Sequence, residues 1–167
     1  MPKFMARGQA LVEFALILPV FILLLVGLLD VGRVVFAYND ASHAARDATR
    51  FASVSPLDCD SIFYVIQHQI QGDDAVTVAV SYRAIPSPSN QNPSWTNVCP
   101  AYNPNATYDN DPATGTMSNA VVPLIGGEIK VTVTNAVSLA TPLISRLLGN
   151  TITDTGSSSM SVSFVPS

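Results

Sequence analysis

The apolar residues of this chain first form one unbroken stretch. Residues 10–29 contain a single charged side chain, Glu13. A helix of that length, rising ~1.5 Å per residue, matches the roughly 30 Å hydrocarbon core of a bilayer, so the stretch predicts a membrane span. An ionisable group inside such a span costs about 2.5 to 3.5 kcal/mol at its centre. Glu13 is therefore a candidate functional residue.

Beyond Asp30 the apolar residues recur at three- and four-residue steps, the spacing of an amphipathic helix. The helix is expected to run from residue 9 to about residue 52, half in lipid and half as a spine outside it. It should end at Ser55-Pro56, because a residue before proline avoids helical angles. Small side chains on the spine suit close packing. The apolar positions are Val31, Val34, Val35, Tyr38, Ala41, Ala45, Ala48 and Ala52, and the other face carries Arg33, Asp40, His43, Asp47 and Arg50.

Two short helices are expected after the spine. Residues 61–71 have apolar positions at helical spacing and are followed by Gly72, a residue that commonly ends helices. Near the C-terminus, Thr141 can cap a helix that begins with proline and spans residues 142–148.

Strands are indicated where apolar and polar residues alternate with period two, in segments 76–83, 129–134 and 159–164. Three strands with one apolar face need a cover, which the spine supplies. We therefore predict an α+β fold, in which a long N-terminal helix packs on a small three-stranded antiparallel sheet with short helices.

Residues 85–122 are rich in Pro, Asn and Ser and show little periodicity. They predict a long loop, and long loops are commonly functional or mobile. Trp95 and Tyr102 lie in it, and they either fold back onto the domain or bind a partner. The sequence does not decide between these.

The charge distribution indicates how the chain is oriented. Only 12% of the residues are charged and the net charge is −4, so no basic cluster exists to bind nucleic acid. Lys3 and Arg7 precede the span, whereas Asp30 offsets Arg33 just after it. The positive-inside rule then places the N-terminus in the cytoplasm and the rest of the chain, after the span, in the periplasm or outside the cell.

A cleavable secretory signal is the main competing interpretation of the N-terminus. The apolar stretch is longer than the about 7 to 15 residues of a signal core, and no A-x-A site follows it in a loop. Glu13 near its start also argues for a retained anchor.

The two cysteines, Cys59 and Cys99, fall in the part expected to be exported, where a pair usually forms a disulfide. The bridge would tie the long loop to the second helix and stabilise the fold by roughly 4 kcal/mol on the chain-entropy model.

No motif for catalysis or a metal is recognisable. Two thiols without nearby histidines make an incomplete zinc site. His43 and His68 are not accompanied by a nucleophile elbow, phosphate loop or zinc-protease helix. Adjacent acidic residues lack the spacing of a calcium loop. These pairs are Asp58/Asp60, Asp73/Asp74 and Asp109/Asp111. We expect neither an enzyme nor a cofactor, and no small-molecule substrate.

The segment RGQALVEFALILP at residues 7–19, followed by Gly32-Arg33 and by the run from Asn39 to Ala52, resembles the TadE-like pseudopilins. These are minor pilins of the tight-adherence (Tad, or Flp) type IV pilus systems. The resemblance covers about residues 7–52. Beyond them it extends only to the order of the expected elements, which is strand, strand, short helix and strand. It implies a pilin-like fold, a place in the inner membrane or the pilus, and a role in adhesion or secretion.

The resemblance also implies processing by a prepilin peptidase after Gly8. Residues 1–8 would be a cytoplasmic leader, residues 9–52 the membrane and spine helix, and residues 53–167 the exported domain. The processing residues would be Gly8, Gln9, Glu13 and Phe14. The implied partners are the peptidase, other pilin or pseudopilin subunits, pilus platform proteins and the lipid bilayer.

The chemistry of these residues fits that processing. Gly8 has no side chain to obstruct a peptidase at its carbonyl. Cleavage would leave an α-amine at Gln9, a natural partner for Glu13 of a neighbouring subunit, because an unpaired carboxylate is costly in lipid. Pro19 removes one helical hydrogen bond and predicts a kink, either merely structural or an aid to extraction from the bilayer. We assign Glu13 and Pro19 to assembly.

The sequence thus predicts a minor pilin or pseudopilin, processed after Gly8 and assembled through its N-terminal helix. Another possibility is a permanent single-pass membrane protein whose exported domain binds a ligand or scaffold. In that case Glu13 would be a carboxylate that reaches the headgroups from a plain anchor.

Overall fold

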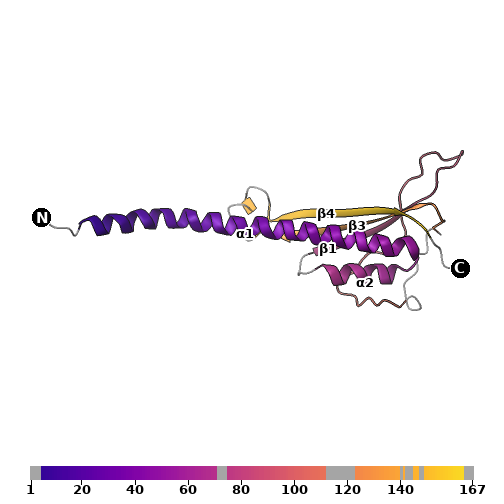
Figure 1. Cartoon of the computed structure of the whole chain (residues 1–167), viewed down its shortest axis with the longest axis horizontal. Helices are drawn as coiled ribbons and strands as arrows, with labels where there is room; N and C mark the ends of the chain where they lie inside the picture. Colours follow the sequence, from indigo (N-terminus) through magenta and orange to yellow (C-terminus); the bar gives the residue numbers. More distant parts are fainter. Residues whose placement is uncertain are drawn as a thin grey trace.

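One long helix, α1 (Met5–Val54), forms both the apolar anchor and the spine of the globular part (Figure 1). The computed structural model describes residues 5–70, 75–111, 123–139, 141, 145–146 and 149–163. Residues 8–25 of α1 are exposed, and the first buried side chain along it is Asp30. The helix is long and apolar enough to cross a membrane, and none of its apolar window is buried. The free part of α1 therefore coincides with the stretch predicted to span the bilayer.

The second helix, α2 (Cys59–Gln69), begins two residues earlier than the sequence indicates. Its N-cap is Asp58, whose carboxylate accepts a hydrogen bond from the Ser61 amide at 3.1 Å. The helix ends at Gln69, and its C-cap is Ile70, which has extended backbone angles. The predicted stop at Gly72 lies outside the described residues. α2 packs along α1 near its C-terminal end (Figure 1).

The sheet has four antiparallel strands, in the order β2-β1-β3-β4, and not the three that we predict from sequence. β1 (Ala75–Arg83) and β3 (Glu128–Ser138) are central and agree with two predicted segments, although β3 continues four residues further. β2 (Thr96–Asn97) is a two-residue strand inside the long loop, too short to produce an alternating pattern.

The last strand, β4 (Thr151–Ser161), begins eight residues before the predicted strand at 159–164. Its residues that face α1 include Asp154, Gly156 and Ser158, so hydrophobic alternation is absent from most of the strand.

The expected helix at 142–148 lies mostly outside the described residues. Ser145 and Arg146 are helical, and the Ser145 amide donates to the Thr141 carbonyl at 3.0 Å.

The core lies between the sheet and a stripe of small residues on α1. Six alanines of α1 are buried, all within 8% exposure, and the prediction of close packing against the spine is confirmed. They are Ala37, Ala41, Ala44, Ala45, Ala48 and Ala52. At Gly156 of β4, an added Cβ would lie 2.5 Å from the carbonyl carbon of Ala41. Helix and sheet are therefore in backbone contact at this glycine.

The predicted apolar face of the spine is wrong in its first two turns. Val31, Val35 and Tyr38 are between 51% and 58% exposed. After Asp30, the buried apolar side chains of α1 begin only at Ala37, because the strands cover α1 from that level onward and approach it closely through alanine. Val31 and Val35 before it, and Tyr38 after it, lie on another side of the helix, whereas Val34 is half-buried.

The described part of the long loop, residues 85–111, folds back onto the domain. Trp95 is half-buried against the outer face of the sheet, with the Arg83 guanidinium 4.8 Å and the Lys130 ammonium 4.4 Å from its ring. Tyr102 packs edge-on against Phe63 of α2. Burial, and then the charge of Tyr108, raises the pKa of Tyr102. Both aromatic residues thus serve packing.

Candidate functional site

The candidate processing residues lie on the exposed first turns of α1. Gly8, Gln9, Glu13 and Phe14 are all exposed. A Cβ added to Gly8 would meet nothing within 4 Å. The peptide bond after Gly8 is therefore open to another protein, although it lies within α1, so a protease would have to unwind that turn to reach an extended chain.

Glu13 is also accessible in this chain. Asp47–Arg50 and Arg83–Glu128 are ion pairs of the described residues, and both lie outside the apolar stretch. Within one copy, α1 extends away from the sheet at this level (Figure 1). A partner for the carboxylate must therefore come from the chain's own N-terminus, from lipid headgroups or from another molecule.

Pro19 lies inside α1 without ending it. The helix is continuous from Met5 to Val54, and Figure 1 shows one long helix with no break. Proline lacks the amide that would bond to the carbonyl four residues earlier, so the helix has one backbone bond fewer here. The expected weak point is thus a missing hydrogen bond inside a continuous helix.

Asp30 fastens the globular domain to the end of the apolar stretch. Its carboxylate is 3% exposed and accepts hydrogen bonds from the Thr141 amide, at 2.9 Å, and from the Thr141 hydroxyl. Thr141 lies 111 residues away, in the connection between β3 and β4. From the sequence, Asp30 is the end of the apolar span and a charge that offsets Arg33, and its bond to Thr141 is not indicated. The signal available there was an acidic residue at the boundary between an apolar run and an amphipathic one.

We expect Asp30→Ala to destabilise this junction by about 1 to 3 kcal/mol, because the buried Thr141 amide loses its acceptor. Asp30→Asn keeps one acceptor oxygen and should lose less. Urea unfolding of the full chain in detergent measures both variants. Equal midpoints for Asp30→Ala and wild type would show that the Asp30–Thr141 contact contributes nothing.

Comparison with known protein families gives one match, and it lies on α1. Residues 8–50 match the TadE-like protein family. The matched segment contains Gly8, Glu13, Pro19 and Asp30, and it confirms the resemblance seen in the sequence. No curated protein and no solved structure matches the chain significantly. The family assignment thus concerns the TadE-like segment, residues 8–50, and not the domain that follows.

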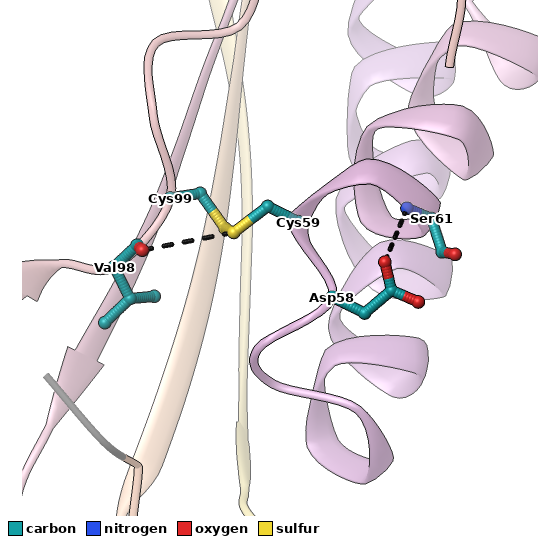
Figure 2. Close-up of a disulfide and its surroundings, with 5 residues drawn as sticks. All are labelled: Asp58, Cys59, Ser61, Val98 and Cys99. Carbon is teal, nitrogen blue, oxygen red and sulfur yellow. Dashed lines mark hydrogen bonds between the residues drawn. A yellow bond between two sulfur atoms is a disulfide. The ribbon is translucent and has the colours of Figure 1, made fainter. Parts of the chain in front are cut away.

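Beyond the TadE-like segment, a disulfide holds the long loop. Cys59 at the start of α2 is bonded to Cys99, 40 residues later, the pairing expected from the sequence (Figure 2). The neighbouring Val98 amide donates to the Val80 carbonyl of β1 at 2.9 Å. The bridge therefore joins α2 to the edge of the sheet beside β2.

A small cavity lies between the end of β1, the first part of the long loop and the turn before β3. Its volume is about 240 Å³. The lining includes the Arg83–Glu128 ion pair and the side chains of Gln91 and Asn92. This volume is below the about 300 to 1,000 Å³ of typical ligand pockets. Among the residues that the structure describes, no group of three or more His, Cys, Asp or Glu could hold a metal ion.

Proposed function

We propose that this chain is a minor pilin or pseudopilin of a Tad-type pilus or secretion apparatus. It would be inserted as a single-span precursor with its N-terminus in the cytoplasm, cut after Gly8 by a prepilin peptidase and assembled through α1. The main support is the match of residues 8–50 to the TadE-like family, on a helix whose apolar window is not buried by any of the residues that the structure describes.

The architecture supports an assembly role. α1 carries the domain at one end and leaves about twenty apolar residues free at the other (Figure 1). A free apolar helix is buried either by lipid or by the helices of neighbouring subunits. Because the α1 backbone runs without interruption from the apolar stretch into the domain, the domain would move with the helix when a subunit passes from bilayer to filament.

Glu13 would set the position of each subunit relative to the next. After cleavage, the α-amine of Gln9 and the Glu13 carboxylate are both located at the start of an apolar helix. In a low-dielectric surrounding, an unpaired charge is costly and a paired one less so. Pairing of Glu13 with the amine of a neighbour would therefore favour a single axial register.

We expect Glu13→Gln to abolish most incorporation into the pilus or its priming complex while leaving membrane levels normal. The amide keeps the shape and hydrogen bonding of the carboxylate but cannot pair ionically with the α-amine. Glu13→Ala should insert at least as well as wild type, because a charge is removed from lipid. The measurement is crosslinking and co-purification of each variant with other pilus subunits, beside membrane fractionation. Unchanged association for both variants would return Glu13 to a plain interfacial carboxylate.

A second candidate function is a permanent membrane protein whose domain binds a ligand. The observation in its favour is the cavity beside Arg83 and Glu128, which lies at the end of the domain far from the apolar helix. Its small volume makes this the weaker proposal. Such a protein would keep its first eight residues.

A further inference from the structure

β4 is the outermost strand on one side of the sheet. In Figure 1 it forms the upper border of the domain. Two backbone bonds fix which of its groups face β3: the Leu139 amide donates to the Asn150 carbonyl at 3.0 Å, and the Val162 amide donates to the Gly127 carbonyl at 2.8 Å. Bonding alternates along an antiparallel pair. The even-numbered residues of β4 therefore bond to β3, and the odd-numbered residues direct their amides and carbonyls to the free edge.

This edge lacks the features that usually prevent strands from pairing. Natural edge strands are commonly short or protected by lysine, proline or a bulge. β4 has eleven residues, and the side chains at its odd positions are all exposed, short and uncharged. They are Thr151, Thr153, Thr155, Ser157, Ser159 and Ser161. The one charged residue, Asp154, belongs to the face that meets α1.

α1 covers only the far end of this edge. Among the backbone bonds of the described residues, one connects α1 to the strand's continuation, from the Ser163 amide to the Ser53 carbonyl at 2.8 Å. Among the described residues, no backbone bond outside the sheet engages the odd-numbered amides and carbonyls between Thr151 and Ser161. These groups form a continuous template, of the kind to which a further strand adds.

The direction of this edge is set by the membrane helix. Gly156 lies against Ala41, the Ser158 carbonyl accepts a hydrogen bond from the Thr49 hydroxyl at 3.2 Å, and Ser163 bonds to Ser53. β4 thus runs in the same direction as α1, away from the apolar stretch. Copies anchored in one membrane therefore present this edge at the same height and in the same direction.

We infer that β4 pairs edge to edge with β4 of a second copy of this chain, as parallel strands. In a parallel pair each residue bonds to the two residues that flank its counterpart. Because odd residues carry the free groups in both copies, the strands must be offset by one residue, a shift of about 3.3 Å.

The geometry and the anchor both favour this partner. Two parallel strands that meet at the same edge are related by a half-turn about the strand direction, so their α1 helices lie on opposite faces of the joined sheet. Each odd position of one copy lies beside an even position of the other, so Asp154 of one copy neighbours an uncharged threonine of the other and the pairing brings no like charges together. Anchoring in one membrane raises the effective concentration of the second copy. The inference goes beyond the proposed function, because it needs the anchor but not cleavage after Gly8.

The test is crosslinking of the full-length protein in isolated membranes with a short bismaleimide. Because of the half-turn and the one-residue offset, residue 157 of one copy lies beside residue 158 of the other, on the same face of the joined sheet. Copies with Ser157→Cys are therefore expressed together with copies that carry Ser158→Cys, and we expect a crosslinked dimer of this chain. Thr77→Cys, expressed together with Ser158→Cys in the same way, is the matched control, because Thr77 is also exposed but lies on β1, which β3 separates from β4. Equal crosslinking of the two variants would indicate random collision, and a crosslink of Ser157→Cys only to a protein of different mass would exclude the second copy as partner. Either result would overturn the inference.

A second pair of variants tests the backbone directly, in Ser157→Cys copies expressed together with Ser158→Cys copies. Thr155→Pro removes an edge amide that does not bond to β3, and proline is tolerated at such positions. Thr155→Val keeps the amide and loses only the hydroxyl. Crosslinking should fall about tenfold or more in Thr155→Pro, as one backbone bond and the close approach around it are lost, and persist in Thr155→Val. An unchanged dimer in Thr155→Pro, with the domain still folded by urea unfolding, would refute pairing through this edge.

Discussion

Gly156→Val is expected to destabilise the domain by about 3 kcal/mol, close to the upper end of what overpacking usually costs. A Cβ at this position would lie 2.5 Å from the Ala41 carbonyl carbon and 2.6 Å from the Ser42 amide nitrogen. These are backbone atoms of α1, so no side chain can rotate away to make room. The helix would have to move off the sheet. Since total stabilities are about 5 to 15 kcal/mol, this loss should be plain in urea unfolding followed by Trp95 fluorescence.

Gly32→Ala is the matched control for that substitution. Gly32 is also on α1, and a Cβ added there would meet nothing within 4 Å. Alanine is favoured over glycine in helices by about 0.8 to 1.0 kcal/mol, so this variant should be slightly more stable than wild type. If Gly156→Val unfolded at the wild-type urea concentration, α1 and β4 would not be in backbone contact.

Gly8→Val is expected to abolish processing altogether, and Gly8→Ala to slow it. In the folded chain the position is open, with nothing within 4 Å of an added Cβ, so neither substitution should disturb the domain. Their effect would arise in the peptidase, where bulk beside the scissile carbonyl opposes binding in a tight site. The measurement is the gel shift between precursor and mature forms in cells that express the peptidase. Conversion of Gly8→Val at the wild-type rate would remove the proposed cleavage site.

The sequence predicts α1, β1 and β3 well because each has a regular apolar pattern. α1 combines an unbroken apolar run with helical spacing, and β1 buries every second residue. β4 was mostly missed because its inward positions hold Asp154, Gly156 and Ser158. At Gly156 the α1 backbone takes the space that a side chain would fill, so the contact leaves no hydrophobic signal.

Some features of the candidate site can be recognised from the sequence and others cannot. Gly8, Glu13 and Pro19 are recognisable from a local motif in the TadE-like segment. The bond between Asp30 and Thr141 is not, because the two residues are 111 positions apart and only the folded sheet brings them together. Trp95 and Tyr102 were likewise undecided until the disulfide and the sheet placed their loop.

Whether the chain is processed can be measured directly from the mass of the protein purified from its native host. The proposed function predicts a mature chain that begins at Gln9, with the first eight residues absent. A permanent membrane protein would retain those residues, and its mass would correspond to a start at Met1. Intact-mass analysis of the native protein, with N-terminal sequencing, therefore tests the account most directly: a start at Gln9 is the predicted result, and a start at Met1 in assembled material would contradict it.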